Sequence, residues 1–377
     1  MKIGIMLRHL DQHAGGVLVY THNLLRQLLA LDTGHEFVLM YRNAAHLGSY
    51  PAGERVRERV MPGWSVLSWD QVAVPRMVEE EQLDLVFNPK YSVPLHADCK
   101  TVFVCHGLDW YVAPQWSRWF DRLSHRYIVP RYAGRADHII AVSNTTREHL
   151  QRFLGVPAAR VSTVYHGVEA SFREPVPAAQ LAETRQRLGL PDRFFLYCGQ
   201  IYPPKNFGRL LRAYADVGPA LGIALAVAGE HTWRCREDLE LVERLGIKRW
   251  VVSLGWVDRA MLPAVYAQAV ALVQPSLYES FGLPVVEALA SGCPVVTANR
   301  YGPAELADGA GLLVEPESVG SIADGLRRVA LDADLRVRLS AAGRERARDF
   351  TWDRCARETL AVLESVGRGT SAVAAAG

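Results

Sequence analysis

The sequence predicts an α/β protein with two doubly wound parallel sheets. Short runs of apolar, mostly β-branched residues alternate with helical patterns along the 377-residue chain, as in sheets whose strands are joined by helices. The runs are continuously apolar, which is typical of parallel strands covered on both faces. A stretch with three prolines, residues 169–193, separates six runs from six others, and at roughly 150 residues per domain the length suits two domains.

The expected strands of the first half are residues 3–7, 37–41, 83–88, 101–105, 138–142 and 161–165. Those of the second half are residues 194–198, 224–228, 251–254, 271–274, 294–297 and 311–314. We expect an N-terminal domain over residues 1–170 and a C-terminal domain over residues 171–352, with a last helix at about 353–367 that packs back on the first domain. Ligands of open parallel sheets bind at the carboxyl ends of the strands, so we expect the site in a cleft between two facing sheets.

The composition excludes several classes of protein. Apolar residues make up 49% and charged residues 22%, which is ordinary for a globular chain, and the net charge of +2 is too even for a protein that mainly coats nucleic acid. The six cysteines form no C-x-x-C pair and read as buried free thiols, and no apolar stretch suits a signal peptide or a membrane span. We therefore expect a cytoplasmic protein, attached at most to a membrane surface. Only five of the 42 basic residues are lysines, so each lysine is a rare choice.

The most informative stretch is residues 275–292. A strand ends there, a glycine-bearing loop follows, Pro284 suits the first helical position and Gly292 suits the helix end. The free backbone amides at the start of this helix form a ready anion site, fit for phosphate. These amides belong to Phe281, Gly282 and Leu283.

Two carboxylates flank this anion site, Glu279 in the loop and Glu287 in the helix. Carboxylates beside a phosphate repel it unless they accept hydrogen bonds from neutral hydroxyls, and sugars supply such hydroxyls. The plainer alternative is that Glu287 complements the helix dipole and that Glu279 is a solvated loop residue.

Three further strand ends carry candidate ligand-binding residues. Lys205 follows the strand 194–198 close to a helix start, where the helix dipole disfavours a cation, so we interpret it as an anion ligand. The pair Gly15-Gly16 follows the first strand and lets backbone approach a ligand, although G-x-G-x-x-G is absent. His106 ends the strand 101–105, a position that faces the expected cleft.

Together these segments resemble the GT-B glycosyltransferases, specifically the retaining family 4 group known as glycosyl transferases group 1. The resemblance covers nearly the whole chain and is most specific in the P-S-x-x-E-S-F-G-L-P-x-x-E-A-L block of residues 275–289. It implies two facing Rossmann-like domains, with the acceptor bound by the first and the nucleotide sugar by the second. The quoted segments are Gly15-Gly16, residues 106–109, 141–144, 165–168, 199–206 and 254–257, the Glu279 to Glu287 block and residues 350–352.

The resemblance also implies a role for each matching residue. Glu279 contacts hydroxyls of the donor sugar, Glu287 holds the ribose, and Lys205 neutralises the diphosphate together with the amides of Phe281, Gly282 and Leu283. The segment with Trp256 and Val257 approaches the nucleobase. His106 hydrogen-bonds near the transferred sugar, and Gly15 and Gly16 lie near the phosphates and the acceptor. His106, Lys205 and Glu279 are thus the expected catalytic residues.

One departure from the family concerns Gln200, where many members carry an arginine. The backbone amides and Lys205 must then neutralise more of the diphosphate charge, or another arginine such as Arg300 takes the place of the missing one. The neutral residue and the Lys-Asn ending of Pro-Pro-Lys-Asn resemble a mannosyltransferase subgroup, so GDP-mannose is the expected donor. UDP-glucose or another nucleotide hexose is the alternative.

The expected chemistry is sugar transfer without a metal or other cofactor. No D-x-D metal-binding motif sits at a plausible strand end. We therefore expect the lysine and the helix amides, instead of a metal, to stabilise the negative charge of the leaving group. The expected product is a polysaccharide or glycolipid, made on a glycan or lipid-linked acceptor. A nucleotide-sugar epimerase shares the fold and remains an alternative, whereas a phosphorylase or a non-catalytic binding protein fits the sequence less well.

A basic, aromatic segment at residues 116–132 suggests contact with a membrane surface. Arg118, Arg122 and Arg126 recur at four-residue spacing, with Trp119 and Phe120 between the first two and Tyr127 after the last. The alternative is a surface helix that packs its aromatic face into the N-terminal domain.

Overall fold

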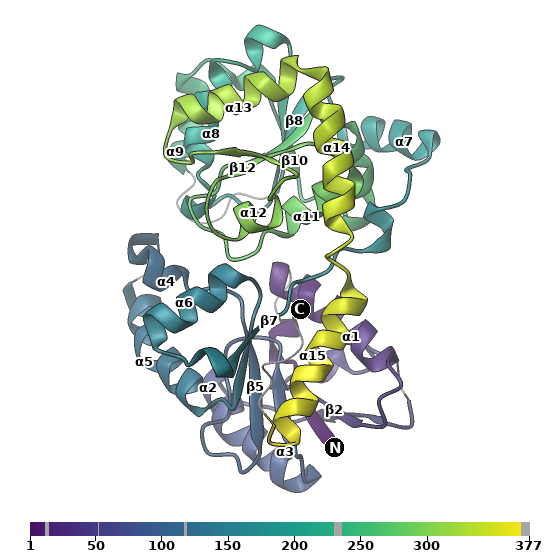
Figure 1. Cartoon of the computed structure of the whole chain (residues 1–377), viewed down its shortest axis with the longest axis vertical. Coiled ribbons are helices and arrows are strands. Elements are labelled where there is room, and N and C mark those ends of the chain that lie inside the picture. The colour runs from purple at the N-terminus through teal and green to yellow at the C-terminus, as the bar shows by residue number, and fades with distance from the viewer. Residues whose placement is uncertain (12–14, 52, 117–118, 230–235, 371–377) are drawn as a thin grey trace. The chain divides into compact units, whose positions relative to one another are not determined.

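The computed structural model describes residues 1–11, 15–51, 53–116, 119–229 and 236–370, without the side chains of residues 119–124, 236 and 239. It forms two compact units (Figure 1). Unit 1 comprises Met1–Gly167 and Trp352–Gly377, and unit 2 comprises Val168–Thr351. The boundary thus falls at Gly167 rather than after residue 170, and the last helix belongs to unit 1.

Unit 1 is built on a parallel sheet of seven strands in the order β3-β2-β1-β4-β5-β6-β7. The sequence predicts six of them and misses the edge strand β3, whose V-R-E-R-V sequence has three charged residues between two valines and no continuous apolar run. An edge strand is covered less than a central one, so its sequence need not be apolar throughout. The strands are β1 Lys2–Met6, β2 Glu36–Tyr41, β3 Val56–Val60, β4 Leu85–Asn88, β5 Lys100–Cys105, β6 His138–Ala141 and β7 Val161–Thr163.

Helices cover both faces of this sheet. Buried side chains of α3, α5 and α6 pack with Met6, Val86 and Phe103, which the strand register places on one face. The C-terminal helix α15 packs against α1 and against β4, β5 and β6 (Figure 1). The helices are α1 Gly16–Ala30, α2 Val66–Ser68, α3 Val74–Glu81, α4 Asp109–Val112, α5 Trp119–Arg135, α6 Asn144–Leu154 and α15 Trp352–Gly367.

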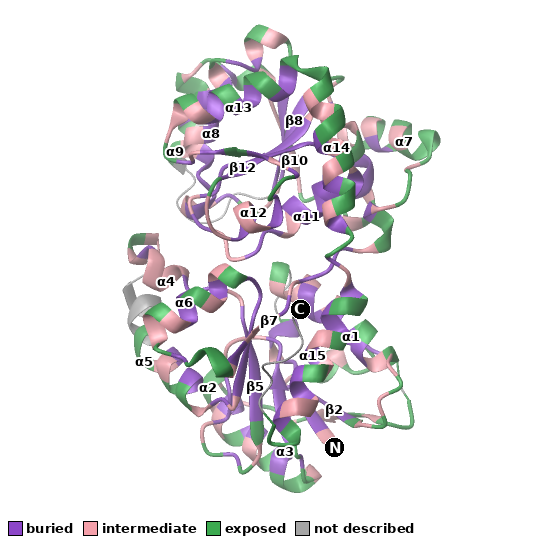
Figure 2. Ribbon diagram, viewed as in Figure 1, coloured by how far each residue is buried: buried purple, intermediate pink, exposed green. Residues whose placement is uncertain are grey.

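Unit 2 repeats the plan with a parallel sheet of six strands in the order β10-β9-β8-β11-β12-β13. These strands are β8 Phe194–Cys198, β9 Ala224–Ala228, β10 Val251–Gly255, β11 Ala271–Gln274, β12 Val295–Ala298 and β13 Leu312–Val314. The helices are α7 Ala178–Leu188, α8 Phe207–Ala215, α9 Arg236–Arg244, α10 Leu262–Gln268, α11 Leu283–Ser291, α12 Tyr301–Leu306, α13 Val319–Leu331 and α14 Ala333–Ala347. The strands β8, β9, β11 and β12 are buried along their length, the edge strand β10 is not, and most helices are buried on one side only (Figure 2).

The strand orders locate one switch point in each sheet. Successive strands proceed outward in one direction from β1 and in the other from β4, and the same reversal separates β8 from β11. In open parallel sheets the loops that leave the two strands at this reversal diverge, and the crevice between them binds ligands. We therefore expect ligand-binding residues in the loops after β1 and β4 and in those after β8 and β11.

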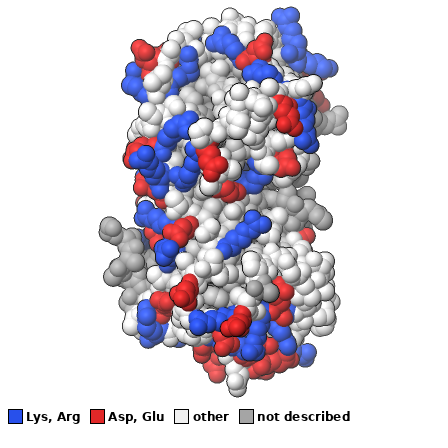
Figure 3. All heavy atoms as spheres, turned by 90° about the vertical axis from the view of Figure 1, so that its right-hand side faces the viewer, with Lys and Arg blue, Asp and Glu red and all other residues white. Residues whose placement is uncertain are grey.

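The surface agrees with the near-neutral composition. Positive and negative side chains are interspersed on the face shown in Figure 3. Among the described residues, no helix is both long enough and apolar enough to cross a bilayer. The five cysteines in the described ranges, which are Cys99, Cys105, Cys198, Cys293 and Cys355, are free thiols.

Candidate active site

A buried ion pair joins the two loops at the switch point of unit 2. Lys205 follows β8 and Glu279 follows β11, and Lys205 Nζ lies 2.6 Å from Glu279 Oε1. The two side chains are only 9% and 13% exposed. The structure thus brings together the lysine and the loop glutamate that the sequence singles out separately.

Backbone and amide contacts fix the position of Lys205. The residue ends a short 3-10 turn, Pro203–Lys205, and Asn206 follows in the left-handed conformation with φ of 60°. Asn206 donates hydrogen bonds from Nδ2 to the carbonyl oxygens of Pro275 at 2.8 Å and Pro316 at 2.6 Å. The loop after β8 is therefore tied to the loops after β11 and β13, which holds the ammonium group in place.

Glu279 is held through both carboxylate oxygens. Oε1 faces the Lys205 ammonium, while Oε2 accepts hydrogen bonds from Ser276 Oγ at 3.2 Å and Gln274 Nε2 at 3.4 Å. Burial lowers the pKa of Lys205, but the carboxylate of Glu279 outweighs burial and raises that pKa above its usual value. Lys205 therefore carries its positive charge at neutral pH.

The start of α11 provides open amides beside this pair. The helix begins at Leu283, so Pro284 occupies the second helical position and not the first as predicted, and Gly292 ends the helix in the left-handed conformation. Gly282 has φ of 116°, a conformation that suits glycine. Within the described part of the chain, the amides of Gly282 and Leu283 donate no hydrogen bond. They remain available to an anion at a helix amino terminus.

Glu287 lies on α11 and is 2% exposed. Its carboxylate accepts a hydrogen bond from Tyr266 Oη at 3.0 Å and lies 2.7 Å from Arg259 Nη2. The same guanidinium also pairs with Glu169. Burial raises the pKa of Glu287, and the positive charge of Arg259 opposes that rise.

Sequence reasoning did not find Arg259 or Tyr266, because neither stands in a recognisable motif. Arg259 comes from the turn before α10 and Tyr266 from α10 itself, so only tertiary structure brings them to Glu287. The predicted substitute for the missing arginine, Arg300, is engaged elsewhere, since it pairs with Glu315 and Glu317. Gln200 is exposed at the end of β8.

The remaining donor-side candidates lie at the ends of neighbouring strands. Trp256 follows β10 and is 63% exposed, whereas the next residue, Val257, is buried. The segments that follow β8 and β9 approach each other so closely that a Cβ on Gly229 would lie 2.1 Å from the carbonyl oxygen of Gly199. An exposed tryptophan at the carboxyl edge of the sheet is a surface on which a planar base can stack.

In unit 1 the predicted residues lie at the ends of β1 and β5. Gly15 has φ of 131° and precedes α1, which begins at Gly16, while residues 12–14 lie outside the described ranges. His106 Nε2 is 2.7 Å from the carbonyl oxygen of Pro89, and because a carbonyl can only accept, Nε2 carries the proton. Burial lowers the pKa of His106 to about 4, so the ring is neutral at pH 7.

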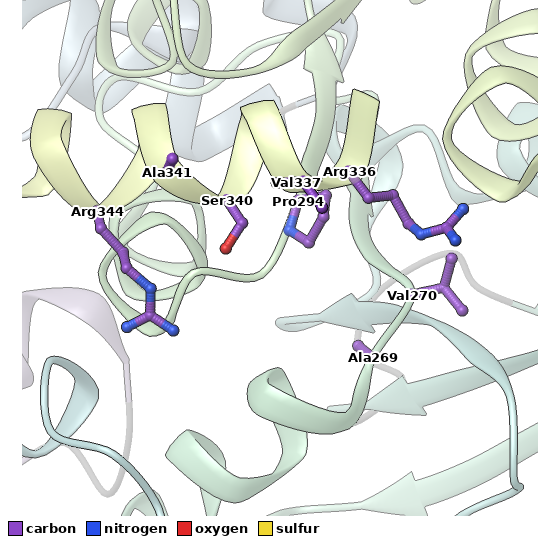
Figure 4. A pocket seen from close by; sticks show the side chains of 8 residues that line it. All are labelled: Ala269, Val270, Pro294, Arg336, Val337, Ser340, Ala341 and Arg344. Atoms are coloured by element: carbon purple, nitrogen blue, oxygen red, sulfur yellow. The ribbon is translucent and has the colours of Figure 1, made fainter. Parts of the chain in front are cut away.

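A separate hollow lies at the amino ends of the strands of unit 2, away from the carboxyl ends that carry Lys205 and Glu279. It has a volume of about 500 Å³ and is lined by residues that precede β11 and β12 and by one face of α14 (Figure 4). Its two arginines, Arg336 and Arg344, donate hydrogen bonds to backbone carbonyls. It shares no residue with the ion pair of Lys205 and Glu279. In the described ranges, no three His, Cys, Asp or Glu side chains gather as metal ligands.

The fold of the chain is that of the GT-B glycosyltransferases. The structure superposes on HepE from Anabaena, solved with UDP-glucose, with a TM-score of 0.77 at 19% identity over 97% of this chain and 100% of that one. The family model "Glycosyltransferase Family 4" matches residues 14–172, and "Glycosyl transferases group 1" matches residues 182–346. The chain belongs to the group 1 glycosyl transferases of family 4, and it is a hexosyltransferase.

Two curated relatives illustrate the range of this similarity. The chain is 28% identical to O-antigen chain mannosyltransferase B of Escherichia coli over 279 residues, which are 72% of each chain. It is 33% identical to the D-inositol 3-phosphate glycosyltransferase of Streptomyces bingchenggensis over 63% of this chain and 54% of that protein. The match thus spans only about half the length of the second relative.

Sucrose-phosphate synthase from Thermosynechococcus elongatus shares the fold, with a TM-score of 0.77 at 22% identity over 98% of this chain and 100% of that one.

Proposed function

We propose that this enzyme transfers mannose from GDP-mannose to a glycan or lipid-linked acceptor, with retention of configuration and without a metal ion. The buried pair of Lys205 and Glu279 at the switch point of unit 2 is the observation that carries the proposal. Mannose is favoured by the similarity to a mannosyltransferase and by the neutral Gln200 followed by Lys205-Asn206. Other nucleotide hexoses and a nucleotide-sugar epimerase are the alternatives.

The proposed mechanism rests on stabilising the leaving group. When the bond from the sugar carbon to the diphosphate oxygen breaks, negative charge grows on the diphosphate. The acceptor oxygen forms its bond to the same carbon, and the proton of its hydroxyl passes to the departing diphosphate. The Lys205 ammonium and the open amides of Gly282 and Leu283 are positioned to stabilise that charge. Preorganised donors of this kind usually supply the largest catalytic contribution.

The carboxylates and the strand-end residues orient the substrates. We propose that Glu279 accepts hydrogen bonds from sugar hydroxyls and Glu287 from the ribose, while the backbone of Phe281 touches the sugar and the segment of Trp256 and Val257 contacts the base. In unit 1, Gly15 and Gly16 allow a close approach of the backbone to substrate. Neutral His106 donates through Nε2 to the carbonyl oxygen of Pro89, which fixes the ring at the end of β5, where we propose that it lies near the transferred sugar.

A thermal-shift panel tests the donor assignment. GDP-mannose, UDP-glucose, a dTDP-sugar and an ADP-sugar are added separately, and a ligand that binds the folded state raises the unfolding temperature. We expect the largest shift with GDP-mannose. A larger shift with UDP-glucose would replace the donor, and a lack of any shift would contradict the proposed function. Assay of sugar transfer against release of a free epimer distinguishes the transferase from the epimerase.

We expect transfer to continue after metal removal. The purified enzyme is treated with EDTA, dialysed and assayed with and without added magnesium or manganese. Because Lys205 and helix amides are proposed to stabilise the diphosphate, the rate of transfer should change by less than about twofold. Removal of a catalytic metal would instead cost several kcal/mol of transition-state stabilisation and lower the rate far more. Loss of activity in EDTA with recovery on adding either metal would overturn metal independence.

Contact of unit 1 with a membrane is part of the proposal for a lipid-linked acceptor. Arg118 and the side chain of Arg122 lie outside the described residues. In the described half of α5, Arg126, Tyr127 and Arg131 are exposed, whereas Val129 and Tyr132 are buried in the unit core. We expect co-sedimentation with phosphatidylglycerol vesicles at low salt and release at high salt, because the attraction is partly electrostatic. A lack of co-sedimentation at low salt favours the packed surface helix.

A further inference from the structure

Lys90 differs from the other lysines in having no counterion among the residues that the structure describes. Within the described residues its ammonium group forms no hydrogen bond or ion pair, and its nearest aromatic contact is the Tyr91 ring, with Nζ 5.6 Å from the centroid. Yet the residue is partly buried. The other four lysines are all paired, as Lys2 with Glu81, Lys100 with Asp137, Lys205 with Glu279 and Lys248 with Glu243.

Lys90 lies in a turn that is held rigidly from two sides. The turn follows β4, and its ends are joined by hydrogen bonds from Asn88 Nδ2 to Ser92 Oγ at 2.7 Å and from the Lys90 amide to Asn88 Oδ1 at 2.9 Å. His106 Nε2 binds the carbonyl oxygen of Pro89 on one side. Arg8 Nη2 reaches Ser92 Oγ at 3.5 Å on the other. The position of Lys90 is thus fixed by its neighbours.

The local charges add up to an excess of one positive charge. Arg8 is compensated by Asp70, since Nε and Nη2 bind the two carboxylate oxygens at 2.7 and 3.2 Å, and this leaves Nη1 outside the pair. Burial lowers the pKa of Lys90 to about 8, with a further lowering by Arg8 that Asp70 opposes. Lys90 is therefore mostly protonated at neutral pH, in surroundings that disfavour its charge. Such a group is retained at a cost in stability, as is common in binding sites.

His9, next to Arg8, supplies an acceptor in the same cluster. Thr21 Oγ1 donates its proton to the carbonyl oxygen of Val17, so His9 Nε2 at 2.7 Å must be the donor to Thr21. The other ring nitrogen, Nδ1, is then an acceptor. It is buried and has no hydrogen-bond partner in the part of the chain that the structure describes. Burial lowers the pKa of His9, followed by the charge of Lys90, so the ring is neutral.

The cluster occupies the switch point of the unit 1 sheet. Arg8 and His9 leave β1 and Lys90 leaves β4, the two strands between which the sheet order reverses. In unit 2 the equivalent loops carry Lys205 and Glu279. Each sheet therefore has a fixed lysine at its switch point, where open parallel sheets bind ligands. Among the described residues, the lysine of unit 2 has an internal counterion and that of unit 1 has none.

We propose that Lys90, assisted by Arg8, binds an anionic group of the acceptor, a phosphate or a carboxylate, and that His9 Nδ1 accepts a hydrogen bond from a hydroxyl of the same molecule. This inference rests on the proposed function, in which unit 1 binds the acceptor. It narrows the acceptor to an acidic sugar, a sugar phosphate or a lipid-linked sugar with its phosphate close to the hydroxyl that reacts.

Equilibrium binding of simple probes tests the subsite directly. Mannose, mannose 6-phosphate and glucuronate are titrated into the wild type in the presence of a saturating nucleoside diphosphate, which occupies the donor site. We expect at least one charged probe to bind about 10- to 100-fold more tightly than mannose, the range for a lost hydrogen bond to a charged group. The better charged probe distinguishes a phosphate from a carboxylate. Equal affinity for all three probes would overturn the proposal.

Three variants assign the preference to Lys90. Lys90→Met should lose it, Lys90→Arg should keep most of it, and Lys100→Met should behave as wild type. Lys100 is a suitable control because it is also a lysine of unit 1 but lies at the start of β5, paired with Asp137. Unchanged preference in Lys90→Met would overturn the assignment.

Donor hydrolysis separates this inference from the proposed function. Release of the sugar to water needs no acceptor, so Lys90→Met should keep the wild-type rate and the wild-type KM for the nucleotide sugar, while the KM for a charged acceptor rises about tenfold or more. A loss of donor hydrolysis in Lys90→Met contradicts an acceptor role. If no nucleotide sugar binds even the wild type, the proposed function fails, and the probe titrations, then run without nucleotide, still decide whether the anion subsite exists.

Discussion

Replacement of Lys205 by methionine is expected to lower the rate of sugar transfer by about 10²- to 10³-fold, the usual loss when one preorganised group that stabilises a developing charge is removed. Gln200 is neutral and Arg300 is engaged by two glutamates, so neither replaces the lost charge. Methionine keeps the length of the apolar stem, which limits the disturbance of packing. Steady-state kinetics with a saturating acceptor measure the effect, and a variant of wild-type activity would refute the assignment of Lys205.

The same substitution perturbs folding, and a second variant separates the two effects. Without Lys205, the Glu279 carboxylate is left nearly buried, with Ser276 and Gln274 as its partners among the described residues, at a cost of about 3 kcal/mol or more. Combining Lys205→Met with Glu279→Gln removes both charges. The double variant should recover most of the stability in denaturant titrations while transfer remains low. Recovery of transfer together with stability would mean that Lys205 acts through the fold alone.

The sequence predicts the fold well where patterns are local. Continuous apolar runs identify the central strands, and the proline and glycine at the two ends of α11 identify that helix. The strand β3 is missed because three of its five residues are charged, so it has no apolar run. The site is predicted less completely, because Arg259 reaches Glu287 from a different element and no spacing in the sequence records that contact.

The scarcity of lysine in the sequence points to Lys205 but not to Lys90. It draws attention to Lys205 because the motif around Glu279 supports it. Lys90 is equally rare, but its significance depends on the absence of a counterion among the described residues and on the strand order that places it beside Arg8. Both are properties of the folded chain, so they become visible only in three dimensions.

Substitution of Glu279 by glutamine should reduce kcat/KM by about 10- to 100-fold, because the carboxylate is proposed to accept hydrogen bonds from the donor sugar. It should also change the pH dependence. In the wild type Glu279 raises the pKa of Lys205 above its usual value, against the effect of burial. Without the carboxylate, burial dominates and the pKa of Lys205 falls below its usual value, so the ammonium loses its proton at lower pH.

The alkaline limb of the kcat/KM profile, which reports ionisations of the free enzyme, is therefore expected at lower pH in Glu279→Gln than in the wild type. Glu287→Gln is the matched control. It alters the other carboxylate of the same motif, which contacts Arg259 and Tyr266 and has no bond to Lys205. This control should raise the KM for the nucleotide sugar and leave the alkaline limb in place. Coincident alkaline limbs in Glu279→Gln and the wild type would show that the protonation of Lys205 does not limit the reaction, and the leaving-group role would then pass to the amides of α11.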